Sequence, residues 1–135
     1  MPVSIVRLGT PRKPNEGLRL GTVRRPPRGV PKADFAKRDF YDVWLPTLAP
    51  TDPLVKEAMS THHDPDAKHR ERTWRDFERK YRAEMKRPDP AHLLDTLAAL
   101  SRQTNFAMGC YCADENLCHR SILRKLLAER GAKLF

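Results

Sequence analysis

The sequence lacks any apolar run approaching the roughly 20 residues that a membrane-spanning helix needs, and it has no internal repeat or low-complexity tract. Its N-terminal stretch, MPVSIVRLGTPRKP, contains an apolar run too short for the hydrophobic region of a signal peptide. We therefore expect a cytoplasmic protein with no membrane partner, in which cysteine thiols stay reduced.

Cysteine is scarce, with 3 residues among 135, and the odd number does not suit a disulfide framework. All three cysteines lie close together in the segment GCYCADENLCHRSILRKLL, residues 109–127. In a reducing compartment, such cysteines are buried in the core, bind a metal or react as thiolates.

Acidic residues are too few to balance the basic ones: 17 Asp and Glu face 26 Lys and Arg, a formal net charge of +9. A net charge of this size gives information about binding partners, not about the fold. A basic surface gains free energy by releasing counterions from phosphates, so we expect an anionic ligand, either a nucleotide or a nucleic acid. The sequence does not reveal the oligomeric state.

Length and pattern predict a single α/β domain over residues 1–135, a compact layered fold in which helices flank a small, mostly parallel sheet. The strand at 105–112 is expected to be central, with the last helix packed against it. A second strand could form a hairpin with the first. We predict strands at 3–8, 18–25 and 105–112, and helices at 53–61, 64–88, 89–102 and 117–130.

Two helix starts follow from capping residues. Asp64 with Pro65 is a good beginning for the helix at 64–88, and Asp89 for the helix at 89–102. In the first of these helices, Trp74, Phe77, Tyr81 and Met85 share one face, as the core-facing stripe of an amphipathic helix requires.

The cysteine segment crosses from a predicted strand into a predicted helix. Cys112 falls at the carboxyl end of the strand, where ligands bind in open α/β sheets. Cys118 falls at the start of the helix, where free N–H groups and the helix dipole attract anions and lower the pKa of a thiol. His119 and Arg120 follow directly and can also stabilise a thiolate.

Three hypotheses for this segment stay open. In the first, Cys118, Cys112 and His119 are catalytic, with Cys118 or Cys112 as a nucleophile beside a bound anion. In the second, Cys110, Cys112, Cys118 and His119 hold a structural zinc ion, although the spacing lacks a C-x₂-C knuckle. In the third, the cysteines are core residues and no cofactor is bound.

Residues elsewhere are predicted to complete an anion site. Those we expect to contact the anion are Arg28, Arg120, Arg25, His63 and Asp64. Two non-enzymatic functions are alternatives to this pocket: a basic nucleic-acid-binding module, suggested by the arginine-dense helix at 68–87, and a zinc-stabilised structural protein. The sequence does not decide whether the protein is an enzyme.

Several segments together resemble a known family. RRPPRGVPK, DVWLPTLAP, HHDP, WRDFERKYRAEM and CYCADENLCHRSIL occur in the order and spacing of the family called domain of unknown function 488, in particular its YeaO-like branch. The resemblance covers roughly residues 3–130 and implies a compact α/β domain, but no established reaction. The positions that it carries over are Arg28, Gly29, Trp44, Pro50, His63, Asp64, Trp74, Tyr81, Cys112, Cys118, His119 and Arg120.

Overall fold

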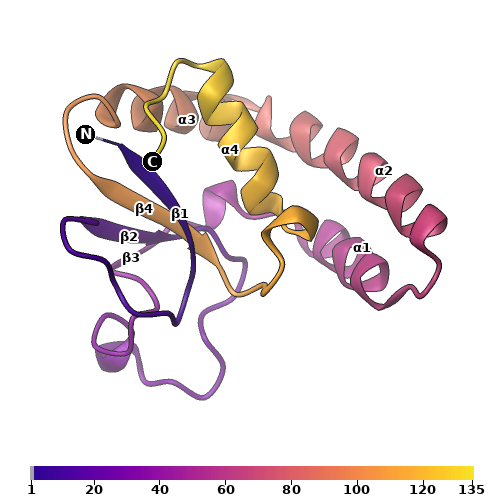
Figure 1. The fold of residues 1–135 in the computed structure, drawn as a ribbon, viewed down its shortest axis with the longest axis horizontal. Helices are drawn as coiled ribbons and strands as arrows, with labels where there is room; N and C mark the ends of the chain where they lie inside the picture. The colour runs from indigo at the N-terminus through magenta and orange to yellow at the C-terminus, as the bar shows by residue number, and fades with distance from the viewer. Residues whose placement is uncertain (1) are drawn as a thin grey trace.

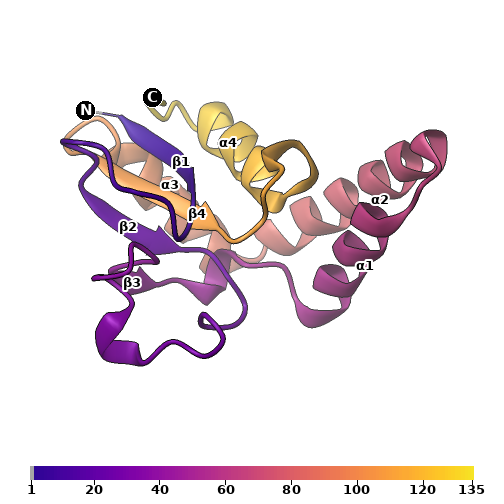
Figure 2. The same ribbon diagram turned by 60° about the horizontal axis from the view of Figure 1, so that its bottom comes forward.

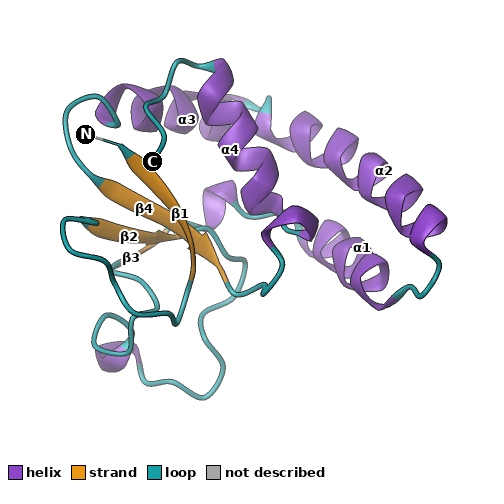
Figure 3. Cartoon of the chain, viewed as in Figure 1, coloured by secondary structure: helices purple, strands orange, loops and turns teal. Residues whose placement is uncertain are grey.

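Four short strands and four α-helices make up the fold in the computed structural model, which describes residues 2–135 (Figures 1 and 3). Three short 3-10 turns lie in the connections, and one of them, Glu115–Leu117, directly precedes the last helix. The elements are β1 (Val3–Arg7), β2 (Leu18–Gly21), β3 (Val43–Trp44), α1 (Asp52–His63), α2 (Ala67–Met85), α3 (Pro88–Leu100), β4 (Phe106–Cys110) and α4 (His119–Glu129).

The sheet is entirely parallel, in the order β1-β4-β2-β3. This confirms the predicted α/β class and the interior position of the strand predicted at 105–112. The expected hairpin between the first two strands is wrong, because β4 lies between them and pairs with both. All five residues of β4 are buried, so it takes the place with a strand on each side.

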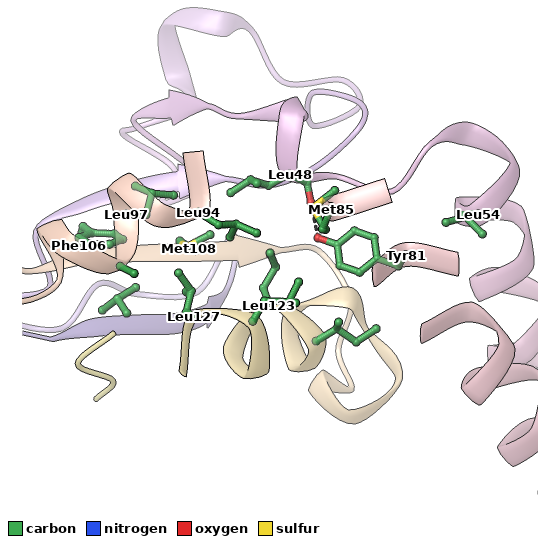
Figure 4. Packing of buried hydrophobic residues seen from close by; sticks show 14 of the residues in the cluster. Leu48, Leu54, Tyr81, Met85, Leu94, Leu97, Phe106, Met108, Leu123 and Leu127 are labelled. Atoms are coloured by element: carbon green, nitrogen blue, oxygen red, sulfur yellow. Dashed lines mark hydrogen bonds between the residues drawn. The ribbon is translucent and has the colours of Figure 1, made fainter. Parts of the chain in front are cut away.

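One face of the sheet carries the main hydrophobic core, built from the strands and from α2, α3 and α4 (Figure 4). Phe106 and Met108 of β4 pack with Leu94 of α3 and Leu127 of α4. The predicted contact of the last helix with the central strand is thus confirmed. Of the aromatic stripe predicted on α2, Phe77, Tyr81 and Met85 are buried, and Trp74 packs against them half-buried.

The other face of the sheet is covered by connecting segments instead of helices. Gly21 and Gly109 are register partners that leave room there for incoming side chains. A Cβ atom at Gly21 would lie 2.3 Å from the Tyr41 ring, and one at Gly109 would lie 2.6 Å from Leu8. Tyr41 and Leu8 belong to a second hydrophobic cluster that also contains Cys110 and Cys118.

The two N-cap residues predicted for helices are wrong. Asp66, not Asp64, caps α2 by accepting hydrogen bonds from the backbone N–H groups of Lys68 and His69. Arg87, not Asp89, is the N-cap of α3, and Pro88 is its first residue. Proline suits that first position, and it also keeps the residue before it extended, as Arg87 is.

α1 and α2 pack against each other as a helical hairpin that extends beyond the sheet (Figure 2). None of the helices in residues 2–135 combines the length and apolar character that crossing a bilayer requires.

Candidate functional site

Parallel strands β2 and β4 end at the same edge of the sheet, and a cavity of about 240 Å³ lies there. Its walls come from the segments that follow these strands, from the start of α4 and from α1. The lining is mainly apolar. We call this cavity the cysteine cavity, because all three cysteines line it. The lining residues are Val23, Arg24, Arg25, Pro50, Val55, Ala58, Met59, His62, Phe77, Cys110, Tyr111, Cys112, Leu117, Cys118 and His119.

The three cysteines form a tight group, the cysteine cluster, made of Cys110, Cys112 and Cys118. All three are free thiols, and their sulfur atoms lie within 4.8 Å of one another. The Sγ atoms of Cys110 and Cys112 are 3.8 Å apart. Cys110 and Cys118 are buried, whereas Cys112 is half-buried.

Arg120 binds both ends of the segment that connects β4 to α4. Its Nε–H donates to Cys118 Sγ at 3.4 Å, and its Nη2 donates to the Cys112 carbonyl at 2.6 Å. The residue is only 3% exposed, so its charge is held inside the protein beside the Cys118 sulfur. A buried guanidinium in this position stabilises a thiolate through a charge-assisted hydrogen bond.

His119 is held by the residue that follows β2. Its Nε2 lies 2.7 Å from the Thr22 carbonyl, an acceptor, so Nε2–H is the donor of this bond. The other ring nitrogen, Nδ1, then lies 3.7 Å from Cys118 Sγ. The Tyr81 ring meets the imidazole edge-on, with ring centroids 5.6 Å apart, and fixes its orientation.

The groups around Cys118 set its protonation. Hydrogen bonds from the Cys110 and Cys112 thiols lower the pKa of Cys118, burial opposes them, and His119 lowers it further. The hydrogen bond with Cys112 lowers the pKa of Cys110, but the hydrogen bond to Cys118 and burial outweigh it and raise this pKa to about 12. Hydrogen bonds to Cys110 and Cys118, with burial, raise the pKa of Cys112 well above its usual range. Burial also raises the pKa of Tyr81. The cluster therefore favours one thiolate, on Cys118.

The predicted site residues divide into those at the cavity and those elsewhere. Cys112, Cys118 and His119 line the cavity, and Arg120 contacts the cluster from α4. Arg25 is at the cavity too, but its guanidinium is 73% exposed and pairs with Asp52.

Three predicted anion ligands do not line this cavity. Arg28 is exposed in the loop after β2, and His63 is exposed at the end of α1. Asp64 follows α1, where it accepts a hydrogen bond from the Asp66 backbone N–H and contacts the His69 ring. The hydrogen bond with His69 is the main cause of a lowered pKa at Asp64. Their predicted roles in anion binding stay predictions.

Four of the seven Lys and Arg residues of α2 pair with acids. Arg75 pairs with Glu71, Arg79 with Asp76, and Arg82 with Glu78 and Glu129. Lys80 pairs with Glu57 and Asp76. Nucleic-acid binding by this helix stays a prediction, because these pairs reduce the free positive charge on which it was based.

His62 is the site residue that the sequence analysis missed. It lines the cavity, and its Nε2 contacts the Leu117 carbonyl, which joins α1 to the segment before α4. A signal was available: Val55, Ala58, Met59 and His62 follow the i, i+3, i+4, i+7 spacing of one helical face. The face of α1 that lines the cavity thus continues to His62, whereas His63, the histidine chosen from the sequence, is exposed.

The sulfur atoms of the cysteine cluster could hold a metal ion. Within residues 2–135, the metal-ligating side chains that lie close enough together to share an ion are these three thiols, and His119 is not part of the group. A tetrahedral zinc site with bonds of about 2.3 Å to sulfur separates two sulfur ligands by about 3.8 Å. The distance between Cys110 Sγ and Cys112 Sγ is also 3.8 Å.

Comparison with known proteins agrees with this arrangement of segments. Residues 3–131 match the family model described as the active DUF488-N3 subclade. The chain belongs to the DUF488 family. No curated protein matches, and neither does any solved structure. The resemblance inferred from the sequence motifs is confirmed at the level of the family.

The DUF488 match spans every strand and helix that builds the cysteine cavity. The matched residues include the whole run from Cys110 to Arg120. As a domain of unknown function, the DUF488 family supplies no reaction, so the chemistry of the cavity has to be argued from its side chains.

Proposed function

We propose that the protein uses the Cys118 thiolate as a nucleophile toward a small electrophilic ligand bound in the cysteine cavity. The observation that carries the proposal is the set of groups around Cys118 Sγ. Arg120 Nε lies at 3.4 Å, His119 Nδ1 at 3.7 Å, and two further sulfur atoms lie within 4.8 Å. A cysteine beside a base and a cation has the arrangement of an activated nucleophile.

Each neighbour has a separate role in this proposal. Arg120 stabilises the thiolate and, through the Cys112 carbonyl, holds the turn after β4. His119, oriented by the Thr22 carbonyl, presents Nδ1 to the sulfur and can exchange a proton with the ligand. The subclade that the chain matches is described as active, and a catalytic role accords with that description.

The lining supports a ligand with an apolar body. Val55, Ala58 and Met59 of α1 form one wall, and Phe77 adds an aromatic surface. The guanidinium groups of Arg24 and Arg25 are engaged elsewhere, because Arg24 donates to the carbonyls of Ala49 and Pro50 and Arg25 pairs with Asp52. The guanidinium that reaches Cys118 Sγ is that of Arg120, and its positive charge favours an electronegative end on the ligand beside this sulfur. A ligand of the nucleotide or nucleic-acid phosphate type stays a prediction, since Arg24 and Arg25 are engaged in these contacts and Arg28 and His63 do not line the cavity.

Site-resolved labelling tests the proposal. With N-phenyl iodoacetamide at neutral pH, Cys118 should be alkylated before Cys110 and Cys112, as followed by mass spectrometry. Ala58→Phe, which places a ring in the cavity, should slow labelling at Cys118 by at least about tenfold, because the reagent's apolar ring loses its binding space. Ala99→Phe, on an exposed position of α3, is the matched control and should label like the wild type.

Either of two labelling results would contradict the proposal. One is faster modification of Cys112 than of Cys118 in the wild-type protein. The other is an unchanged rate at Cys118 in Ala58→Phe, which would place the route to the sulfur outside the cavity.

A second candidate function is metal binding by the cysteine cluster. The specific observation is the separation of 3.8 Å between the sulfur atoms of Cys110 and Cys112, which matches an edge of a tetrahedral zinc site. Thiolates are also the ligands that soft metals prefer. In this candidate, the three cysteines are structural and the metal stabilises the turn between β4 and α4.

Metal analysis of the purified protein separates the two candidates. We expect less than about 0.1 zinc ion per chain, because three thiols without a fourth protein ligand do not complete the four-ligand set of a structural zinc site. Close to one zinc ion per chain, lost in Cys110→Ser, would favour the metal-binding candidate and contradict the expectation.

A further inference from the structure

The cysteine cluster contains more thiols than a single nucleophile requires. Cys110 is held in β4, where it is the register partner of Arg7, so its backbone is fixed by the sheet. Cys112 lies after the strand, in the turn that leads to Glu115–Leu117, and it is the half-buried member of the cluster. Cys112 is therefore the thiol whose backbone can move toward Cys118.

Arg120 keeps Cys112 and Cys118 together. One guanidinium donates to the sulfur of Cys118 and to the carbonyl of Cys112. A disulfide needs a sulfur–sulfur distance of about 2.05 Å and Cα atoms roughly 4.4–6.8 Å apart. The sulfur atoms of Cys112 and Cys118 start within 4.8 Å, so a small movement of the turn brings them to bonding distance.

Pairing between Cys110 and Cys112 is less favourable, although their sulfur atoms are close. Residues two positions apart in an extended chain have Cα atoms separated by about 6.6 Å, near the upper limit for a disulfide. Cys110 cannot shorten this distance without breaking its place in the sheet. Cys110 is at the same disadvantage for a bond to Cys118, because the sheet fixes its backbone whereas Cys112 lies beyond the strand. The geometry therefore favours Cys112 as the partner for Cys118.

We propose that Cys112 is the resolving thiol for Cys118, and that the site reduces organic hydroperoxides. This inference rests on the proposed function, since it needs Cys118 to be the nucleophile. It adds the class of substrate and the fate of the sulfur after the first step. An organic hydroperoxide has an apolar body, which suits the apolar lining of the cavity, and an electronegative end, which suits the Arg120 guanidinium beside Cys118 Sγ.

The reaction balances in two steps. The Cys118 thiolate attacks the terminal oxygen of the hydroperoxide, the O–O bond breaks, and the alkoxide leaves and takes a proton from water to become an alcohol. Cys118 is then a sulfenic acid. The Cys112 sulfur attacks the Cys118 sulfur, the S–O bond breaks, and hydroxide leaves with the Cys112 proton as water. The disulfide that forms is reduced to two thiols by an external dithiol, which is oxidised.

The test uses the full-length reduced protein, its metal content measured, with one equivalent of cumene hydroperoxide. The wild-type protein should lose about 2 Da as two hydrogen atoms leave, and dithiothreitol should restore its mass. Trypsin leaves all three cysteines in one peptide, residues 103–120, so the linkage is mapped by cleavage after Tyr111 and Glu115. These cuts separate Cys110 from Cys112 and Cys112 from Cys118.

Two cysteine variants assign the partner. In Cys112→Ser, the yield of disulfide should fall by at least about tenfold, and a sulfenic acid at Cys118 should be captured by dimedone. In Cys110→Ser, or in Cys110→Ala if the serine variant is unfolded by circular dichroism, the disulfide that forms should still join Cys112 to Cys118, whatever its rate. Arg124→Met, which makes no hydrogen bond to the cysteine cluster, is the control that should form this disulfide as the wild type does. Cumene hydroperoxide should react at least about tenfold faster than hydrogen peroxide, which has no apolar body.

The outcomes that overturn the inference differ from those that overturn the proposed function. A disulfide that persists in Cys112→Ser, or a stable dimedone adduct at Cys118 in the wild type, removes Cys112 as the resolving thiol while Cys118 stays the nucleophile. Faster reaction with hydrogen peroxide removes the organic substrate class. No modification of Cys118 in any variant contradicts the proposed function itself.

Discussion

Replacing Arg19 by methionine is expected to lower the free energy of unfolding by about 3–5 kcal/mol, measured by urea denaturation. Arg19 is 1% exposed, and its Nε donates to Glu16 Oε2 at 2.8 Å. Its Nη1 also donates to the carbonyls of Thr10 and Asp39, at 2.7 and 2.6 Å. The variant leaves the Glu16 carboxylate buried with no cation beside it, which is the costly way to break an ion pair.

The matched control for this variant is Arg25→Met. Arg25 also pairs with a carboxylate, that of Asp52, but the two side chains are 73% and 56% exposed. Exposed pairs contribute about 0–1 kcal/mol, so this variant should unfold close to the wild type. The double variant Arg19→Met/Glu16→Gln should recover part of the loss. Equal stability of Arg19→Met and Arg25→Met would contradict the structural role given to the buried pair.

Replacing Arg120 by methionine is expected to slow alkylation of Cys118 at pH 6 by about 2–10-fold, because the ionisation equilibrium shifts about 10–100-fold from a state that is almost fully ionised at this pH. Hydrogen bonds to charged groups contribute about 1.5–3 kcal/mol, and each 1.4 kcal/mol changes an equilibrium tenfold. The Nε–H that reaches Cys118 Sγ is lost in the variant, so a smaller fraction of the thiol is ionised. Iodoacetamide labelling followed by mass spectrometry measures the rate.

Arg124→Met controls for the loss of an arginine from the same helix. Arg124 lies on α4 and pairs with Glu115 at 2.9 Å, and it makes no hydrogen bond to the cysteine cluster. This variant should keep the wild-type rate at Cys118. Because Arg120 also binds the Cys112 carbonyl, the urea midpoint of each variant is measured as well. Equal labelling rates in folded Arg120→Met and in the wild type would contradict a role of the guanidinium in stabilising the Cys118 thiolate.

The edge of the sheet that carries the site was predictable because its signals are local. A short buried segment, residues 106–110, stands before a helix start, and that order places Cys112 and Cys118 at the carboxyl end of a strand. The sequence segments on which the family resemblance was based include the same residues. The cavity that receives these side chains also depends on α1, which is distant in the sequence. His62 of α1 could be identified as a lining residue only once the position of this helix was known.

Other features could not be predicted from the sequence, because they depend on contacts between segments far apart along the chain. Alternation within 18–25 marks a strand, yet it does not reveal that Arg19 is buried while Leu18 is 58% exposed. Loops, not helices, cover the face of the sheet on which Arg19 lies. The carbonyls of these loops and the Glu16 carboxylate accept hydrogen bonds from the guanidinium, and these bonds make its burial possible. Strand order is also non-local, since β4 inserts between β1 and β2 from 85 or more residues further along the chain.

The rate of iodoacetamide alkylation at Cys118 as a function of pH tests the central claim most directly. The claim is that one thiolate persists on Cys118, since the hydrogen bonds from Cys110 and Cys112, with His119, lower its pKa. A free thiol with a pKa of about 8.5 is only about 0.3% ionised at pH 6, and its rate rises about tenfold per pH unit up to that value. For protein shown to be free of metal, we predict a nearly constant rate at Cys118 between pH 6 and pH 9. A tenfold rise per pH unit over this range, with a midpoint near 8.5, would contradict the account.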